Sequence, residues 1–382
     1  MLKRKTNPAI MATLICGLTS VTFSDATYAV QHGLFGNVSV DDNSLDRADS
    51  DTFVSELIFY SADTLYGNFT YLWEFEFEKT IEHQDAHTER FHIKYSFADE
   101  LKLSLGQFHS PIGYWNRTFH HGSILFDTVE RPFFLDFDAN KNASTVTPVH
   151  YIGMMADGIF ETDDAQWKYQ FGAGNGSEIS TNQNTSGDRP EIESGTSINS
   201  DNINLSYHLS YHPDEQPYHL GFFVMRNEVQ ESGSLTDNSI TQYQAKLTDQ
   251  NLYGLEASYK MGNFDLIAEH FWFRHTNQAD RAGAYNASAF YIQLGYQFSA
   301  PLKAIYRYSQ LDLEAGDLYF DILGAEEQYH NVFTLKYELN EFNAIKLEAD
   351  QQSFLYGAQG NVYTIRLQWS FMWNNPLDAI VN

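Results

Sequence analysis

Cysteine is almost absent from this sequence: Cys16 is the only one among 382 residues. It lies in the apolar stretch Ala9 to Leu18, which follows three basic residues and precedes a run of mostly small residues ending at Ala29. This order predicts a secretory signal peptide over residues 1–29 and a mature region over residues 30–382. A lipoprotein signal at Cys16 is disfavoured because the bulky Ile15 precedes it. Disulfides and thiolate metal sites are therefore excluded from the mature chain.

Basic residues and long apolar runs are also scarce. The chain has 23 Lys and Arg against 50 Asp and Glu, a formal net charge of -27. Such a balance excludes nucleic acid as a partner, because no basic surface remains to replace the counterions of phosphates. Mean hydropathy is -0.40, and no stretch after the signal approaches the ~20 apolar residues of a spanning helix. If the mature chain lies in a membrane, it must therefore be a β-barrel.

Proline is rare and aromatic residues are common. There are 9 Pro, 29 Phe and 24 Tyr, which suits strands with aromatic girdles at the two membrane interfaces. The clearest strand is 362–373, where Tyr363, Ile365, Leu367 and Trp369 alternate with polar residues that include Arg366. Successive side chains of a strand point to opposite faces, so this segment has one apolar and one polar wall. A secreted sandwich or propeller would also be rich in strands and tyrosine.

The spacing of such segments separates these fold classes. We expect sixteen strands, at about 31–40, 52–61, 66–79, 89–98, 101–110, 148–161, 166–175, 200–212, 218–229, 251–261, 264–274, 287–298, 303–313, 329–339, 343–354 and 362–373. Short turns alternate with long polar loops, as in bacterial outer-membrane barrels. Two strands fit poorly: Glu269 is out of register within 265–273, and 54–60 is apolar on both faces. A bulge or a subunit contact would explain either one.

An antiparallel transmembrane barrel of about sixteen strands is wide enough for an aqueous channel. Its polar face would then line the pore, and the predicted pore-lining residues are Glu74, Glu76, Glu78, Lys94, Lys168, Lys336, Glu338, Lys346, Glu348, Asp350, Arg366 and Gln368. Charges at a pore wall bias which ions pass, and the acidic excess favours cations. Plain solvation of a wide, unselective channel is the alternative.

The longest loop, 111–147, carries many large apolar residues, which disfavours disorder; they include Phe119, Ile124, Leu125, Phe126, Phe133, Phe134, Leu135 and Phe137. We expect it to fold into the barrel and narrow the channel. Its candidate constriction residues are His120, His121, Asp127, Glu130, Arg131, Asp136 and Asp138.

A family resemblance rests on this region. The stretches LSLGQFHSPIGYWNR (Leu103 to Arg117), FHHGSILFDTVERPFF (from Phe119) and TPVHYIGM (from Thr147) resemble the porin superfamily, and within it the porin O and P type of phosphate-selective porins. The resemblance implies a sixteen-stranded barrel, often a homotrimer, in the bacterial outer membrane, with lipid and lipopolysaccharide around it and small hydrophilic solutes inside. Phosphate selectivity in such porins depends on basic lining residues. The inward positions here are mixed with an acidic excess, so that label is not carried over.

Catalytic and metal sites are the competing interpretation of the histidines. His109 and His150 lie at the two ends of the long loop, and His208 and His212 lie on one face of a strand. The latter two would be roughly 13 Å apart at strand rise, too far to share an ion. Solvated or hydrogen-bonded histidines are the simpler explanation, so we expect no metal, no cofactor and no enzyme activity. A closed barrel acting as a surface receptor, adhesin or rim enzyme stays open as an alternative to the channel.

Overall fold

The computed structural model describes residues 31–44, 52–80, 84–119, 122–136, 145–180, 192–194, 202–236, 240–278, 283–355 and 360–374. Sixteen long antiparallel strands in this part of the chain form one closed barrel, as the sequence predicts. The expected signal peptide, together with His120, His121 and Asp138, lies outside the described residues. Within the described residues, no helix is both long and apolar enough to cross a bilayer.

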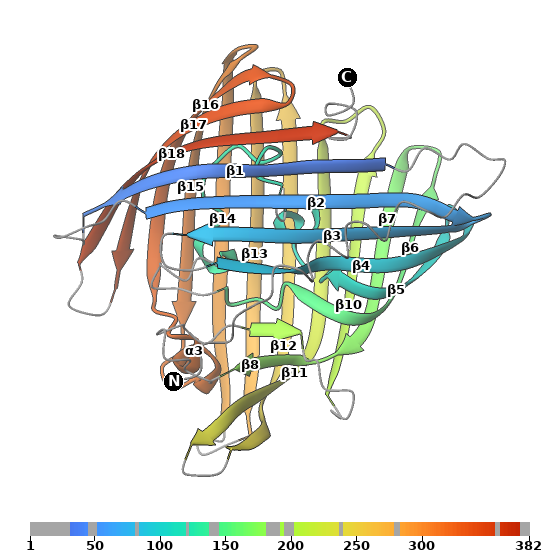
Figure 1. Ribbon diagram of the computed structural model, residues 1–382, viewed down its shortest axis with the longest axis vertical. Helices are drawn as coiled ribbons and strands as arrows, with labels where there is room; N and C mark the ends of the chain where they lie inside the picture. Colours follow the sequence, from blue (N-terminus) through green and yellow to red (C-terminus); the bar gives the residue numbers. More distant parts are fainter. Residues whose placement is uncertain are drawn as a thin grey trace, which may run out of the picture.

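The strands of the barrel follow one another around it in chain order. They are β1 (Gln31–Asn43), β2 (Thr52–Tyr66), β3 (Phe69–Thr80), β4 (Gln84–Ala98), β5 (Leu101–His109), β6 (His150–Glu161), β7 (Ala165–Asn175), β10 (Ile203–Pro213), β11 (Tyr218–Thr236), β12 (Ile240–Met261), β13 (Phe264–Asn277), β14 (Gly283–Ser299), β15 (Leu302–Leu313), β16 (Gln328–Asn340), β17 (Asn343–Phe354) and β18 (Asn361–Asn374). The last strand, β18, pairs with β1 and closes the barrel; in this pairing Val38 lies opposite Trp369. In Figure 1 the strands β1 to β4 cross in front of β12 to β15, which form the far wall.

Two strands are much longer than the sequence predicts, and two short strands lie in a segment that it predicts to be a loop. β11 and β12 continue to Thr236 and back from Ile240, so most of the predicted loop Gln230–Gln250 is a hairpin with paired backbones. The short strand β8 (Ser177–Ser180) pairs with β11 in parallel, and β9 (Ile192–Ser194) pairs with β8. Backbone pairing outside a membrane needs no apolar face, so the alternation pattern did not reveal these extensions.

The outer face of the barrel is apolar and aromatic. On β18 Tyr363, Ile365, Leu367 and Trp369 are exposed, while the alternate residues are buried. Aromatic side chains gather at the rim that carries the short turns, where Phe69 lies 4.6 Å from Tyr95, and Phe264 4.6 Å from Tyr296, between ring centroids. Aromatic girdles of this kind mark the interface between lipid and water in outer-membrane barrels.

The inner face carries a hydrophobic core on one side. This core joins the loop between β5 and β6 to inward side chains of β11 to β15, and its buried members include Trp115, Phe126, Phe134, Phe223, Phe271, Phe273 and Tyr291. It also includes α3 (Leu318–Leu323), which lies between β15 and β16. The misfit at Glu269 is thereby explained. β13 pairs with both neighbours without a bulge, and its inward residues are apolar because they face the loop.

Candidate functional site

The long connection between β5 and β6 lies inside the barrel. Its described residues, 110–119, 122–136 and 145–149, are here called the inner segment; they include α2 (Tyr114–Thr118) and the short 3-10 helix Phe133–Leu135. The two ends of the inner segment are tied together, because the Ser110 N–H donates to the Val149 carbonyl at 2.6 Å. The Asn116 side-chain amide donates to the same two residues, at 2.8 Å to the Ser110 carbonyl and 3.3 Å to that of Val149.

The start of α2 is held by a buried carboxylate on β13. Glu269 accepts the backbone N–H groups of Tyr114 at 2.7 Å and Trp115 at 2.8 Å, and the hydroxyl of Tyr291 at 2.5 Å. Gly113 makes this approach possible. Its φ of 71° is in the left-handed region, and a Cβ there would lie 2.5 Å from Glu269 Oε2. The glycine of the family-like motif is therefore needed for both its conformation and its size.

A second carboxylate binds the other end of α2. Arg117 Nη2 forms a short ion pair with Glu256 Oε1 on β12, and His208 Nε2 on β10 lies 2.9 Å from the same oxygen. Glu256 is almost fully buried. An isolated buried carboxylate is costly, so this pairing is what allows the charge inside the wall.

Basic residues on β15 and β17 hold the middle of the inner segment. Arg307 donates to Thr128 Oγ1 and to the Glu130 carbonyl, both at 2.8 Å. Lys346 Nζ donates to the carbonyls of Ser123 at 2.5 Å and Thr128 at 2.9 Å. Both basic side chains are fully buried. They therefore bind the inner segment to the barrel wall and do not face water.

Glu348 on β17 binds the middle of the inner segment as a hydrogen-bond acceptor. Its two carboxylate oxygens accept the N–H groups of Val129 at 2.7 Å and Glu130 at 3.1 Å. The Glu130 side chain in turn lies 2.8 Å from Arg366 Nε on β18. Arg366 also forms a very short ion pair with Asp350 on β17.

Asp127 of the inner segment forms ion pairs with two lysines of the barrel wall. Its carboxylate lies 2.6 Å from Lys303 Nζ on β15 and 3.1 Å from Lys336 Nζ on β16. Burial by itself would raise the pKa of Asp127, but the two ammonium groups outweigh this effect and lower that pKa below its usual value. The carboxylate is therefore ionised at neutral pH and links the segment to two strands.

The predicted pore-lining residues fall into two groups. Lys336, Lys346, Glu348, Asp350, Arg366 and Gln368 are buried on β16 to β18, and the first five lie in the network of wall residues that holds the inner segment. The others lie elsewhere on the wall. Glu74 and Glu76 are buried, Glu78 and Lys94 are half-buried, and Lys168 and Glu338 are exposed.

The predicted constriction residues are placed as follows. Asp127 and Glu130 make the contacts given above, and Arg131 contributes its carbonyl, which accepts from Arg307 Nη2 at 2.7 Å. Asp136 ends the 3-10 helix and is half-buried. The inner segment therefore presents its charged groups mainly to the wall of β15 to β18.

The wall of β3 to β7, here called the opposite wall, carries paired charges of both signs. Arg90 binds the Glu74 carboxylate through two nitrogens, at 2.5 and 2.7 Å. Lys94 Nζ lies 3.2 Å from Asp157 Oδ1, and the Lys94 side chain is 30% exposed. The accessible groups there are thus largely balanced pairs.

Sequence reasoning missed several of the residues that organise this site. The alternation pattern does not single out Arg307, Glu256 or Arg117, and it marks Glu269 only as a misfit. That misfit was the available signal, because a carboxylate among inward apolar residues must have a buried partner. The identity of the partner depends on contacts distant in sequence, which alternation does not encode.

Comparison with known proteins gives one family. The family profile described as phosphate-selective porin O and P matches residues 32–371. No curated protein sequence matches the chain.

Three solved structures of similar fold are distant in sequence. In-vitro folded OmpT of Vibrio cholerae superposes with a TM-score of 0.56 at 10% identity, covering 93% of this chain and 100% of that one. The anion-selective porin of Comamonas acidovorans gives 0.56 at 12% identity, with 91% and 99% covered. OprB of Pseudomonas putida gives 0.60 at 10% identity, with 91% and 94% covered. At these identities the likeness concerns the fold alone.

Proposed function

The chain belongs to the phosphate-selective porin O and P family and is therefore an outer-membrane channel; on this premise we propose that it passes small hydrophilic solutes and ions by passive diffusion. One observation carries the proposal. The inner segment is fastened to β12 through β18 by buried ionic and hydrogen-bonded contacts, while Lys94 and Lys168 on the opposite wall keep contact with solvent. The proposed route runs between the inner segment and the opposite wall.

We propose that this route discriminates weakly between ions. The acidic excess of the sequence predicts a cation preference, but Glu74 and Glu76 are buried and Glu74 is paired with Arg90. The more accessible charges of the opposite wall include Lys94 with its partner Asp157 and the exposed Lys168. Because charge bias at a pore depends on groups that reach the water, the net charge of the chain does not support a cation filter.

The test is the reversal potential of the reconstituted protein under a KCl gradient. Weak discrimination predicts a value close to zero. A value near the Nernst potential of K⁺ or Cl⁻ would contradict it. The alternative of a closed barrel acting as a receptor, adhesin or rim enzyme predicts no current at all, so the same preparation separates the two functions.

Assembly and processing are also proposals. One structural neighbour is a trimer form of OmpT from Vibrio cholerae, and we propose a homotrimer surrounded by lipid and lipopolysaccharide, to be tested by chemical crosslinking in detergent. We propose cleavage after Ala29, which predicts Val30 as the first residue when the mature protein is sequenced.

A further inference from the structure

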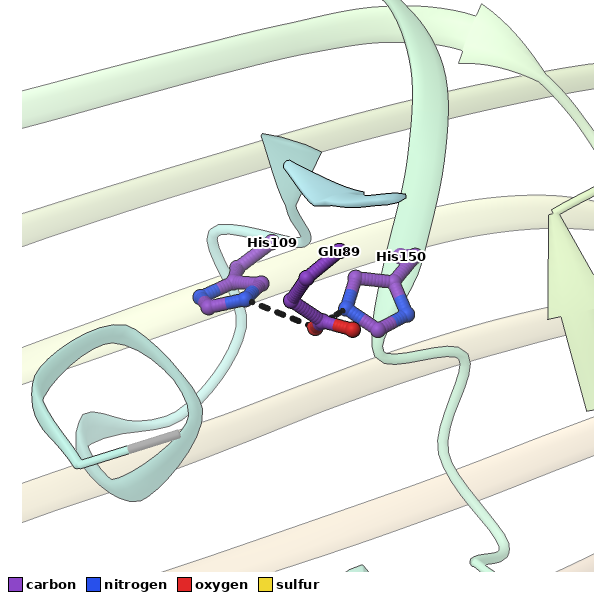
Figure 2. A group of neighbouring side chains, drawn as sticks. All are labelled: Glu89, His109 and His150. Carbon is purple, nitrogen blue, oxygen red and sulfur yellow. Dashed lines mark hydrogen bonds and ion pairs between the residues drawn. The ribbon is translucent and has the colours of Figure 1, made fainter. Parts of the chain in front are cut away.

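Two histidines and one carboxylate meet where the inner segment leaves the barrel wall. His109 Nε2 at the end of β5 lies 3.2 Å from Glu89 Oε1 on β4, and His150 Nε2 at the start of β6 makes a short contact with the same oxygen. Figure 2 shows the two imidazole rings flanking the carboxylate, one from each side. Their ring centroids are 5.1 Å apart. One ligand atom from each residue lies within 4.8 Å of those from the other two.

The backbone brings Glu89 into this position through a bulge. On β4, Thr88 pairs with Phe75 and Arg90 pairs with Glu74, so Glu89 is the extra residue between them. A bulge redirects the side chain of the strand that contains it. The Gln107 amide stabilises the bulge, since it donates to the carbonyls of Thr88 at 3.1 Å and Glu89 at 2.9 Å.

The pairing of β5 with β6 fixes the two histidines. His109 and His150 are direct partners in this ladder, and the next residues inward, Ser110 and Val149, close the ends of the inner segment with a hydrogen bond. The Glu89 side chain is 1% and that of His109 7% exposed, whereas that of His150 is 18% exposed and leaves an approach from solvent.

We propose that Glu89, His109 and His150 form a binding site for a divalent transition-metal ion of the zinc type. Two imidazole nitrogens and a carboxylate oxygen are a donor set that zinc prefers, at about 2.0–2.2 Å from each, with a water in the fourth position. The ion would replace the hydrogen bonds that now join these groups. It would also crosslink β4, β5 and β6 at the closed end of the inner segment.

The surroundings of Glu89 fit this assignment. Its second oxygen, Oε2, lies 3.2 Å from His87 Nε2, which orients the carboxylate. Outer partners of this kind fix the direction of metal-binding side chains. Among the described residues, two groups have the spacing of metal ligands, and both contain Glu89. His208 and His219 also approach one carboxylate oxygen, Glu256 Oε1, at 2.9 and 3.9 Å, but Arg117 pairs with that oxygen and the group does not have the spacing of metal ligands.

The experiment is a calorimetric titration of the purified, metal-free protein with ZnCl₂, using a preparation without a histidine tag. One Zn²⁺ per chain is expected, with MgCl₂ giving no comparable heat because Mg²⁺ prefers oxygen ligands. His109→Gln and His150→Gln should each weaken zinc binding by more than about tenfold. His270→Gln, which removes a histidine of β13 that pairs with the outward-facing Leu255, should leave zinc binding unchanged.

Equal zinc binding by His150→Gln and His270→Gln, or zinc binding no tighter than magnesium binding, would overturn the site. A second measurement covers the case in which the variants do not fold. Co²⁺ added to the wild-type protein should give the intense visible absorption of a tetrahedral site, with two imidazole nitrogens seen by X-ray absorption. Octahedral Co²⁺ without imidazole ligands would overturn the proposal just as directly. None of these readouts depends on conductance.

Discussion

Glu348 on β17 accepts the backbone N–H of Val129 at 2.7 Å, across 219 positions of sequence. The contact is between a fully buried side chain of the barrel wall and the main chain of the inner segment. It shows how the barrel holds its inner segment: wall side chains bind backbone groups that a loop cannot pair by itself. An unpaired buried N–H is costly, so the wall charges specify where the segment lies.

Glu348→Gln should loosen the inner segment. A glutamine amide presents one oxygen and one NH₂ group, so it cannot accept from Val129 and Glu130 with both ends as the carboxylate does. Leaving one buried N–H unsatisfied costs about 1–3 kcal/mol. The expected results are greater open-channel current noise and faster limited proteolysis within residues 122–136. Glu161→Gln, at an exposed strand end, is the control. Equal noise and equal proteolysis in both variants would rule out this role for Glu348.

Gly113→Ala should destabilise the barrel more than Gly262→Ala does. Both glycines have positive φ, 71° and 58°, and an L-residue there costs roughly 1–2 kcal/mol. Only at Gly113 would the new Cβ also meet a carboxylate, 2.5 Å from Glu269 Oε2, since nothing lies within 4 Å of Gly262. The measurement is the temperature at which each variant loses its heat-modifiable gel mobility. The same temperature for the two variants would contradict the proposed Gly113–Glu269 packing.

Asp127 should make the inner segment sensitive to acid. Its pKa is lowered in the folded protein by Lys336 and Lys303 against the opposing effect of burial. A lowered folded-state pKa gives a stabilisation that is complete above the unfolded-state pKa of about 3.9 and is lost as the pH falls through the folded-state value. Stability relative to Asp127→Asn should therefore be constant from pH 7 to 5 and decline below about pH 4. If the stability advantage of the wild-type protein over Asp127→Asn grew as the pH fell, the proposed role of the ionised Asp127 would be contradicted.

The sequence predicts the strands of the barrel wall better than it predicts the contacts of the inner segment. The expected limits of 343–354 coincide with β17, and those of 362–373 differ from β18 by one residue at each end. These limits follow from local alternation and turns, which a short window of sequence contains. The pairing of Glu348 with Val129 or of Arg307 with Thr128 is not local. Sequence places each of these charges on a face, but only the fold decides whether that face meets water or the inner segment.

Lys94→Gln should shift the reversal potential towards cations. The Lys94 side chain is 30% exposed beside Asp157, so its removal leaves an acidic group on the proposed route. Arg226→Gln is the matched control, because Arg226 pairs with the outward-facing Leu205 and is exposed on the outer face of the barrel. An equal shift in the two variants would show that the opposite wall is not the route.

The most direct test of the account is single-channel recording of the purified wild-type protein in a planar bilayer. An open route beside a firmly held inner segment predicts discrete steps of current in KCl that rise linearly with voltage and recur in other simple salts. Absence of current in every salt, from protein whose heat-modifiable mobility shows an intact barrel, would contradict the channel function.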